Sequence, residues 1–222
     1  MKVTLVDHMG TDLTVVNAAR VSFNKTSEFV VDEWTNNLSL NTKDTKLISY
    51  LAKHNHWSPF AHCQVQFHFK APIFVARQLA KSQVGMVWNE VSRRYVDEEP
   101  EFYMPKDYRL KAQDKKQGSS DKVTSNNEYF QEYAVRHAEF CKQMYTQLIG
   151  DDVCPEIARI FLPINTYTEW YWTGSLVAWA RVFNLRTKPD AQKETQEIVR
   201  QIDPIMTELF PVSWKGLTGE KA

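Results

Sequence analysis

The segment Ala71–Tyr95 reads APIFVARQLAKSQVGMVWNEVSRRY, and its two halves show different periodicities. From Pro72 to Ser82 the apolar residues recur at helical spacing, which predicts a helix. The second half fits a period of two and predicts a strand. That strand would carry Glu90, Ser92 and Arg94 on one face. A helix followed directly by a strand favours a fold that mixes the two elements.

The expected row of a carboxylate, a hydroxyl and a guanidinium has a chemical meaning. Together these groups suit a ligand that offers hydrogen-bond donors and also a phosphate. Arg77, Gln78, Lys81 and Arg93 add further polar and cationic groups in the same segment. The competing interpretation is a charged edge strand that is simply solvated. The segment alone leaves both interpretations open.

The composition limits what such a ligand could be. The 222 residues include 27 Lys plus Arg and 27 Asp plus Glu, so no net charge attracts nucleic acid or an anionic membrane. A phosphate would therefore be bound by local arginines. No apolar run approaches membrane-spanning length, and we expect no membrane partner. Three scattered cysteines without a CxxC pair predict reduced thiols and a cytoplasmic location.

Periodicity and capping residues predict the other elements. The clearest is a strand at His62–Lys70, in which Cys63, Val65, Phe67 and Phe69 face one way. Thr11 or Asp12 and then Asn41 or Thr42 are expected to cap two helices. The remaining predictions are a strand at Lys2–Asp7, a loop at 24–40, a polar surface loop at 111–127, helices at 128–149 and 166–185, and a last helix after Pro189.

Predicted strands and helices are mixed along the chain, but they do not follow a regular βαβ order. We therefore predict an α+β fold with residues 1–222 as one domain. Several site classes lack their motifs. No GxGxxG, GxxxxGK or GxSxG pattern is present. His62 and His68 would lie about 20 Å apart along their strand, and His54 and His56 lack a further ligand nearby, so no metal site is predicted.

A second group of arginines lies in the C-terminal third. Arg159, Arg181 and Arg186 occur among aromatic and aliphatic residues, where a guanidinium is costly unless it pairs with an anion. This favours an anionic planar ligand such as a nucleotide. Arg186 also ends a predicted helix, so a salt bridge or an interaction with the helix dipole is the alternative.

Six segments, in this order, resemble the flavin-dependent thymidylate synthases, the ThyX family. They are AARVSF (18–23), HNHWSPFAH (54–62), APIFVARQ (71–78), NEVSRRY (89–95), ARIFLPINTYTEWYWT (158–173) and NLR…AQ (184–192). The resemblance covers nearly the whole chain outside the polar loops.

The resemblance implies a function and an assembly. Members of the family methylate dUMP to dTMP, with methylenetetrahydrofolate as the carbon donor, FAD as the hydride carrier and NADPH as its reductant. They are homotetramers whose active sites combine residues of several subunits. For this chain the family implies a mixed, largely antiparallel sheet with packed helices, and a site for dUMP and folate.

Carried over by position, the resemblance also implies residue roles. Arg186 would face the uracil ring and favour its N3-deprotonated form, which makes it the expected catalytic residue. The expected dUMP-binding residues are Gln78, Glu90, Ser92, Arg93, Arg94, Arg159 and Arg186. The expected cofactor-binding residues are Ser58, Lys81, Ser82, Gln83, Glu90, Ser175 and Arg181.

The chain departs from the family pattern at one signature. Lys81-Ser82-Gln83 stands where the family usually has Arg-His-Arg, with one extra residue before Asn89, so two guanidinium groups are replaced. Arg181 lies one helical turn after Val177 and could restore a charge missing there. The variant signature resembles phage-like members, which suggests a viral gene and a host cytoplasm. The alternatives are a diverged flavoenzyme with another acceptor and a non-catalytic nucleotide-binding protein.

Overall fold

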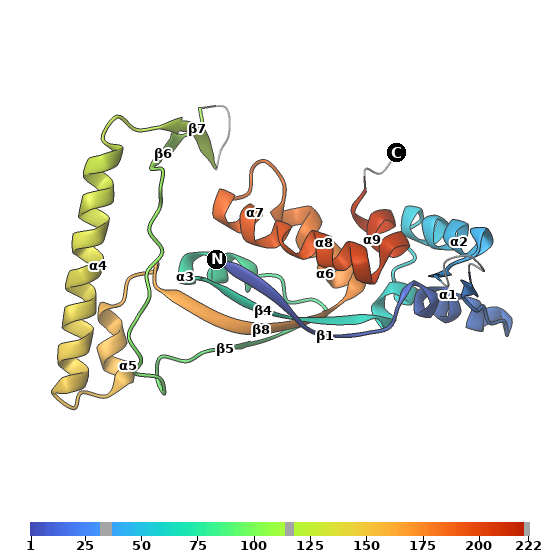
Figure 1. The fold of residues 1–222 in the computed structure, drawn as a ribbon, viewed down its shortest axis with the longest axis horizontal. Helices are drawn as coiled ribbons and strands as arrows, with labels where there is room; N and C mark the ends of the chain where they lie inside the picture. Colours follow the sequence, from blue (N-terminus) through green and yellow to red (C-terminus); the bar gives the residue numbers. More distant parts are fainter. Residues whose placement is uncertain (32–36, 114–117, 220–222) are drawn as a thin grey trace.

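The centre of the fold is a four-stranded antiparallel sheet in the order β1-β4-β8-β5 (Figure 1). In this computed structural model the strands are β1 (Lys2–Met9), β4 (Gln64–Pro72), β8 (Tyr167–Ser175) and β5 (Met86–Glu90). The structure describes residues 1–31, 37–113 and 118–219. The observed mixture of helices with an antiparallel sheet confirms the predicted α+β class.

Strand β4 confirms the alternation that predicted it. Cys63, just before the strand, and Val65, Phe67 and Phe69 within it are fully buried, whereas the intervening residues are only partly buried. Phe67 packs edge-on against Trp179 with ring centroids 4.9 Å apart. The apolar face of the sheet thus forms one core with the helices above it.

Four helices of the C-terminal segment lie on one side of this sheet, as Figure 1 shows. They are α6 (Leu176–Arg186), α7 (Lys193–Arg200), α8 (Ile202–Leu209) and α9 (Pro211–Thr218). The prediction of a single last helix after Pro189 was therefore wrong, because α7, α8 and α9 follow that residue. Phe210 leaves helical geometry with φ −138°, and the proline after it is suited to begin a new helix.

The predicted helix at 166–185 was also wrong in its first half. Residues up to Ser175 form β8, because Thr168, Trp170 and Trp172 alternate towards the core and pair with β4. Ser175 then accepts a hydrogen bond from the backbone N–H of Ala178 at 3.4 Å and caps α6.

The N-terminal helices begin where their capping residues predicted. They are α1 (Asp12–Arg20), with Thr11 as its N-cap, and α2 (Thr42–Lys53), where Asn41 accepts a hydrogen bond from the N–H of Asp44. A short 3₁₀ helix follows α1, and another begins at Ser58. Their bounds are η1 (Val21–Phe23) and η2 (Ser58–His62).

The predicted loops contain short strands. Within 24–40, β2 (Val30–Val31) pairs with β3 (Leu38–Ser39), and residues 32–36 fall outside the described part of the chain. The segment 111–127 is not all loop either. It includes the last residue of β6 (Arg109–Lys111) and all of β7 (Ser119–Val123), which pair antiparallel and are also joined by the Arg109–Ser119 contact; residues 114–117 are not described.

The long helix α4 (Asn127–Gly150) stands beside the sheet and confirms the helix predicted at 128–149 (Figure 1). It leads into α5 (Pro155–Ala158) and the 3₁₀ turn η3 (Arg159–Phe161). The segment Ala71–Tyr95 contains α3 (Ile73–Leu79), a turn at Gly85 with φ +75°, and then β5. Among the described helices, none combines the length and hydropathy needed to cross a membrane.

Candidate functional site

Seven of the residues expected to form the site line three separate pockets of one chain. We name them by two lining residues each: the Gln78–Arg186 pocket of about 530 Å³, the Glu90–Arg159 pocket of about 380 Å³ and the Trp57–Arg181 pocket of about 240 Å³. The first two contain most of the residues expected to bind dUMP. The third contains one residue expected to bind the cofactor, Arg181.

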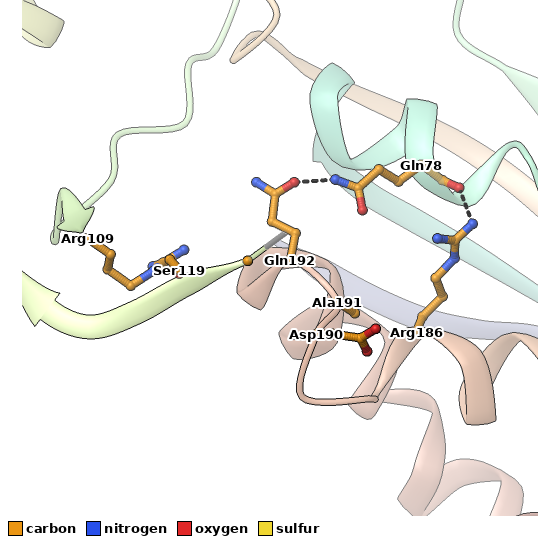
Figure 2. Close-up of a pocket in the computed structure, with 8 residues that line it drawn as sticks. Gln78, Arg109, Ser119, Arg186, Asp190, Ala191 and Gln192 are labelled. Atoms are coloured by element: carbon orange, nitrogen blue, oxygen red, sulfur yellow. Dashed lines mark hydrogen bonds between the residues drawn. The ribbon is translucent and has the colours of Figure 1, made fainter. Parts of the chain in front are cut away.

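The Gln78–Arg186 pocket lies where α3 and α6 end and α7 begins (Figure 2). Nη2 of Arg186 donates a hydrogen bond to the backbone carbonyl oxygen of Gln78 at 2.7 Å. The side chain of Gln78 donates to Gln192 and accepts a hydrogen bond from the hydroxyl of Thr195 at 3.2 Å. These contacts fix a guanidinium and an amide on adjoining helix ends.

Arg186 is half-buried, and its burial lowers the pKa of the guanidinium below the usual value. Its Nε is buried without a hydrogen-bond partner among the described residues. A charged donor that is both desolvated and unpaired is costly, and an acceptor on a ligand would remove that cost. The arrangement therefore suits an anionic or electron-rich ring in the pocket.

The far wall of this pocket comes from the hairpin. Arg109 donates from Nε to the hydroxyl of Ser119 at 2.8 Å and from Nη2 to Oε1 of Glu194 at 2.6 Å. Burial alone would raise the pKa of Glu194, but hydrogen bonds from Arg109 and the backbone outweigh it, and the pKa is lowered. Figure 2 shows Arg109 and Arg186 on opposite sides of the pocket.

The Glu90–Arg159 pocket lies at the end of β5. Oε1 of Glu90 accepts a hydrogen bond from the hydroxyl of Thr168 at 2.8 Å, and Oε2 accepts one from the indole N–H of Trp88 at 3.2 Å. The carboxylate is thus held in place while its side chain remains exposed. Arg159 and Ser92 line the same pocket, which brings a cation and a hydroxyl close to the carboxylate.

The predicted strand row of Glu90, Ser92 and Arg94 was wrong, because β5 ends at Glu90. The chain turns there, with the N–H of Tyr95 bonded to the carbonyl of Ser92 at 3.0 Å. The turn instead places Ser92 and Arg93 in the pocket lining. Arg94 lines none of these three pockets, and its Nε lies 3.4 Å from a carboxylate oxygen of Glu156.

The positions expected to contact flavin are grouped less closely. Ser175 caps α6, and the turn at Gly85 packs against this cap, since a Cβ at Gly85 would lie in van der Waals contact with the serine hydroxyl at 3.4 Å. Nη2 of Arg181 donates to the carbonyl of Val84 at 3.3 Å and so ties α6 to the turn that follows α3. Lys81, Ser82 and Gln83 lie in this turn.

The Trp57–Arg181 pocket has a largely apolar lining. Ser58 is exposed at the start of the 3₁₀ turn η2, directly after Trp57. The lining includes His56, and the indole of Trp57 is 64% exposed. A flat exposed aromatic surface beside the Arg181 guanidinium suits a planar ligand that carries a phosphate.

Sequence reasoning did not assign four of the polar side chains that line the Gln78–Arg186 pocket. Arg109 and Ser119 line the Gln78–Arg186 pocket from the hairpin, and Asp190 and Gln192 line it from the start of α7. The motif NLR…AQ included Gln192, but Arg109 and Ser119 had no motif around them. No cluster of three His, Cys, Asp or Glu that could hold a metal occurs in the described ranges.

Comparison with known proteins identifies the family. The family model described as thymidylate synthase complementing protein, Thy1, matches residues 4–212. A flavin-dependent thymidylate synthase of Thermus thermophilus is 37% identical over 212 residues, which cover 96% of this chain and 73% of that protein. A second, from Thermosipho africanus, is 36% identical over 216 residues, which cover 96% and 88%.

The fold also matches a solved structure. The UMP/dUMP methylase PolB of Streptomyces cacaoi, bound with 5-Br dUMP, superimposes with a TM-score of 0.81 at 32% identity, covering 98% of this chain and 94% of that one. The sequence and structural matches agree, and the predicted family is confirmed. The chain belongs to the Thy1 family, the flavin-dependent thymidylate synthases.

Proposed function

We propose that this enzyme methylates dUMP to dTMP, with methylenetetrahydrofolate as the carbon donor and NADPH as the reductant of bound FAD. The observation that carries the proposal is the half-buried Arg186, which is held against Gln78 at the edge of a pocket and whose Nε has no partner in the described part of the chain. A fixed cation beside the uracil ring would stabilise the anion that forms when N3 loses its proton, and would polarise the ring for reaction.

The nucleotide would use two of the pockets. Gln78 and Arg186 would bind the base, and the carboxylate, hydroxyl and guanidinium groups of the Glu90–Arg159 pocket would bind the sugar and phosphate. The proposed set in that second region is Glu90, Ser92, Arg93, Arg94 and Arg159. Arg94 would have to leave its contact with Glu156 or bind from the rim.

The residues present also fit a flavin. The Trp57–Arg181 pocket combines an exposed indole with one cation, and Arg181 also orders the turn that carries Lys81, Ser82 and Gln83. Ser58 and Ser175 would complete the hydrogen bonds to the cofactor. Bound FAD would supply the hydride chemistry that amino-acid side chains lack. Lys81 replaces a planar guanidinium with a compact ammonium, which bonds phosphate as a point charge.

We further propose a homotetramer whose active sites combine residues of different subunits. In its favour, the residues proposed for one nucleotide lie in two distinct pockets of a single chain. A neighbouring subunit that brings its Glu90–Arg159 pocket to the Gln78–Arg186 pocket would complete the site. Large exposed apolar residues on α4, such as Tyr133, Val135 and Phe140, supply surface for such contacts. A cytoplasmic location and a viral origin remain predictions.

A direct assay tests the function. Purified protein is incubated with FAD, NADPH, methylenetetrahydrofolate and dUMP, and nucleotide products are separated by chromatography. We expect dTMP to form and to require each component. UMP is the informative second acceptor, because PolB of Streptomyces cacaoi is a UMP/dUMP methylase. Flavin reduction without a methylated nucleotide would indicate a flavoenzyme with another acceptor, and a protein that binds dUMP but no flavin would contradict the proposal.

A further inference from the structure

The guanidinium of Arg109 has an unusual set of partners. Its Nε is bonded to Ser119 and its Nη2 to Glu194, but Nη1 has no hydrogen-bond partner in the described part of the chain. The side chain is only 18% exposed and lines the Gln78–Arg186 pocket opposite Arg186 (Figure 2). Two bonds therefore fix the plane of the guanidinium and leave one nitrogen of a pocket-lining cation unused.

Glu194 explains how that orientation is maintained. It is 4% exposed, lies in the first turn of α7 and bonds Arg109 through Oε1, while Oε2 is buried without a hydrogen-bond partner among the described residues. A buried ion pair is seldom more stable than a hydrophobic pair of similar size. A gain in stability therefore explains the buried Arg109–Glu194 pair poorly. Orientation of the Arg109 guanidinium by Glu194 explains it better.

We propose that Arg109, oriented by Glu194, is a binding residue for an anionic oxygen of a ligand in the Gln78–Arg186 pocket. Guanidinium groups bind phosphate and carboxylate oxygens with matched planar geometry. The inference rests on the proposed function only in the choice of candidate ligands. The phosphates of NADPH, the glutamate carboxylates of the folate, and the dUMP phosphate if it binds here instead of in the Glu90–Arg159 pocket, share this chemistry, and the experiment distinguishes these three sources.

The test uses a variant that removes both charges. Replacing Arg109 alone would leave the Glu194 carboxylate buried and unpaired, so the double substitution Arg109→Gln and Glu194→Gln is the cleaner change. Dissociation constants of the FAD-loaded protein for dUMP, NADPH and tetrahydrofolate are measured by calorimetric titration. We expect one of the three constants to rise about tenfold to a hundredfold, as loss of a charged hydrogen bond implies, and the others to stay within about twofold. The ligand that weakens identifies the source of the anionic oxygen.

Two further variants separate binding from support of the hairpin. Arg109→Lys keeps a cation opposite Glu194 but loses the fork, and should weaken the same ligand by a smaller factor. Lys193→Ala is the matched control, because Lys193 joins α7 to Asp121 of the same hairpin and does not line the pocket. It should leave all three constants unchanged.

Some results would overturn the inference. Unchanged constants in the double variant would remove Arg109 from the binding residues, and an equal weakening of all three ligands would show that the pair only supports the hairpin. Neither result depends on turnover. The dTMP assay of the unaltered protein decides the proposed function independently, since these titrations measure binding whether or not dTMP forms.

Discussion

Nη2 of Arg186 lies 2.7 Å from the backbone carbonyl oxygen of Gln78, so the last residue of α6 is bonded to the last turn of α3. Because the acceptor is a backbone atom, the contact fixes the guanidinium without neutralising it. The predicted alternative of a salt bridge at this helix end finds no acidic partner for Arg186 among the described ion pairs. A preorganised positive charge thus faces the pocket.

Replacing Arg186 should impair the chemical step more than the binding of FAD. Arg186→Ala removes both the charge and the fork, and loss of one preorganised partner costs roughly 2.7–4 kcal/mol, or about a hundredfold to thousandfold in rate. Arg186→Lys keeps a cation and should lose less. Flavin reduction by NADPH should largely survive in both variants. The measurements are FAD content, melting temperature and dTMP yield on the same preparations.

Arg200→Ala is a matched control for that experiment. Arg200 also ends a helix and donates to a backbone carbonyl, that of Thr187, at 3.4 Å, but it is exposed and lines none of the three pockets. It should cost a little thermal stability and leave turnover per folded enzyme unchanged. Near-normal dTMP synthesis by folded Arg186→Ala would remove Arg186 from the catalytic residues.

The sequence predicted correctly those helices and strands whose position depends on neighbouring residues. The caps at Thr11 and Asn41 and the alternation around Phe67 are readable from neighbouring residues alone. The segment 166–175 was misread as a helix because the sequence does not display the partners of a strand. Pairing with β4 and β5 on both sides makes it a central strand.

The site was predictable as a set of residues and not as an arrangement. The motifs identified Gln78, Glu90, Arg159 and Arg186, yet no sequence pattern indicates that one chain divides them between two pockets. Arg109 had no signal at all, because its role depends on a carboxylate 85 residues away. Contacts between residues so far apart in the sequence arise only from tertiary packing.

The enzyme should not need a cysteine nucleophile. Burial and the charge of Asp12 raise the pKa of Cys63 to about 12, and burial also raises that of Cys141, so both thiols stay protonated near neutral pH. Replacing Cys63, Cys141 and Cys154 together by alanine should cost about 1–2 kcal/mol of stability and preserve dTMP formation per folded enzyme. Activity lost in a well-folded single variant would contradict this expectation.

Asp12 should be important for stability and unimportant for chemistry. Its buried carboxylate accepts hydrogen bonds from the N–H groups of Val212 at 2.8 Å and Ser213 at 2.9 Å, in the first turn of α9. Asp12→Ala should cost about 2–3 kcal/mol of unfolding free energy, measured by denaturant titration. The Val212 and Ser213 amides should also exchange hydrogen faster. An unchanged denaturation midpoint would exclude this anchoring role.

Acid should weaken the contact between the hairpin and α7. The pKa of Glu194 is lowered from its ordinary 4.5, so its stabilising contribution is present above that value and is lost as pH falls through the folded-state pKa. Denaturant titrations between about pH 3 and 6 should therefore show stability falling at the acid end. Glu194→Gln should flatten that part of the profile. An identical acid slope in both proteins would assign the loss to other carboxylates.

Mixing two inactive variants tests whether the sites are shared between subunits. Arg186→Ala disables the Gln78–Arg186 pocket, and Arg159→Ala disables the Glu90–Arg159 pocket on a different surface of the chain. If each active site combines one pocket of either kind from two subunits, random co-assembly leaves about a quarter of the sites with both pockets intact. Co-expressed variants, purified through two different tags, should then recover dTMP formation to about that fraction of the unaltered enzyme.

Each variant assembled alone should stay inactive, since every site would carry the same defect. If both pockets served one site within a single subunit, every subunit of the mixture would be defective, and co-assembly would recover nothing. Activity that stays at the level of the separate variants, in a mixed oligomer confirmed by sedimentation and by retention of both tags, would therefore exclude the shared site.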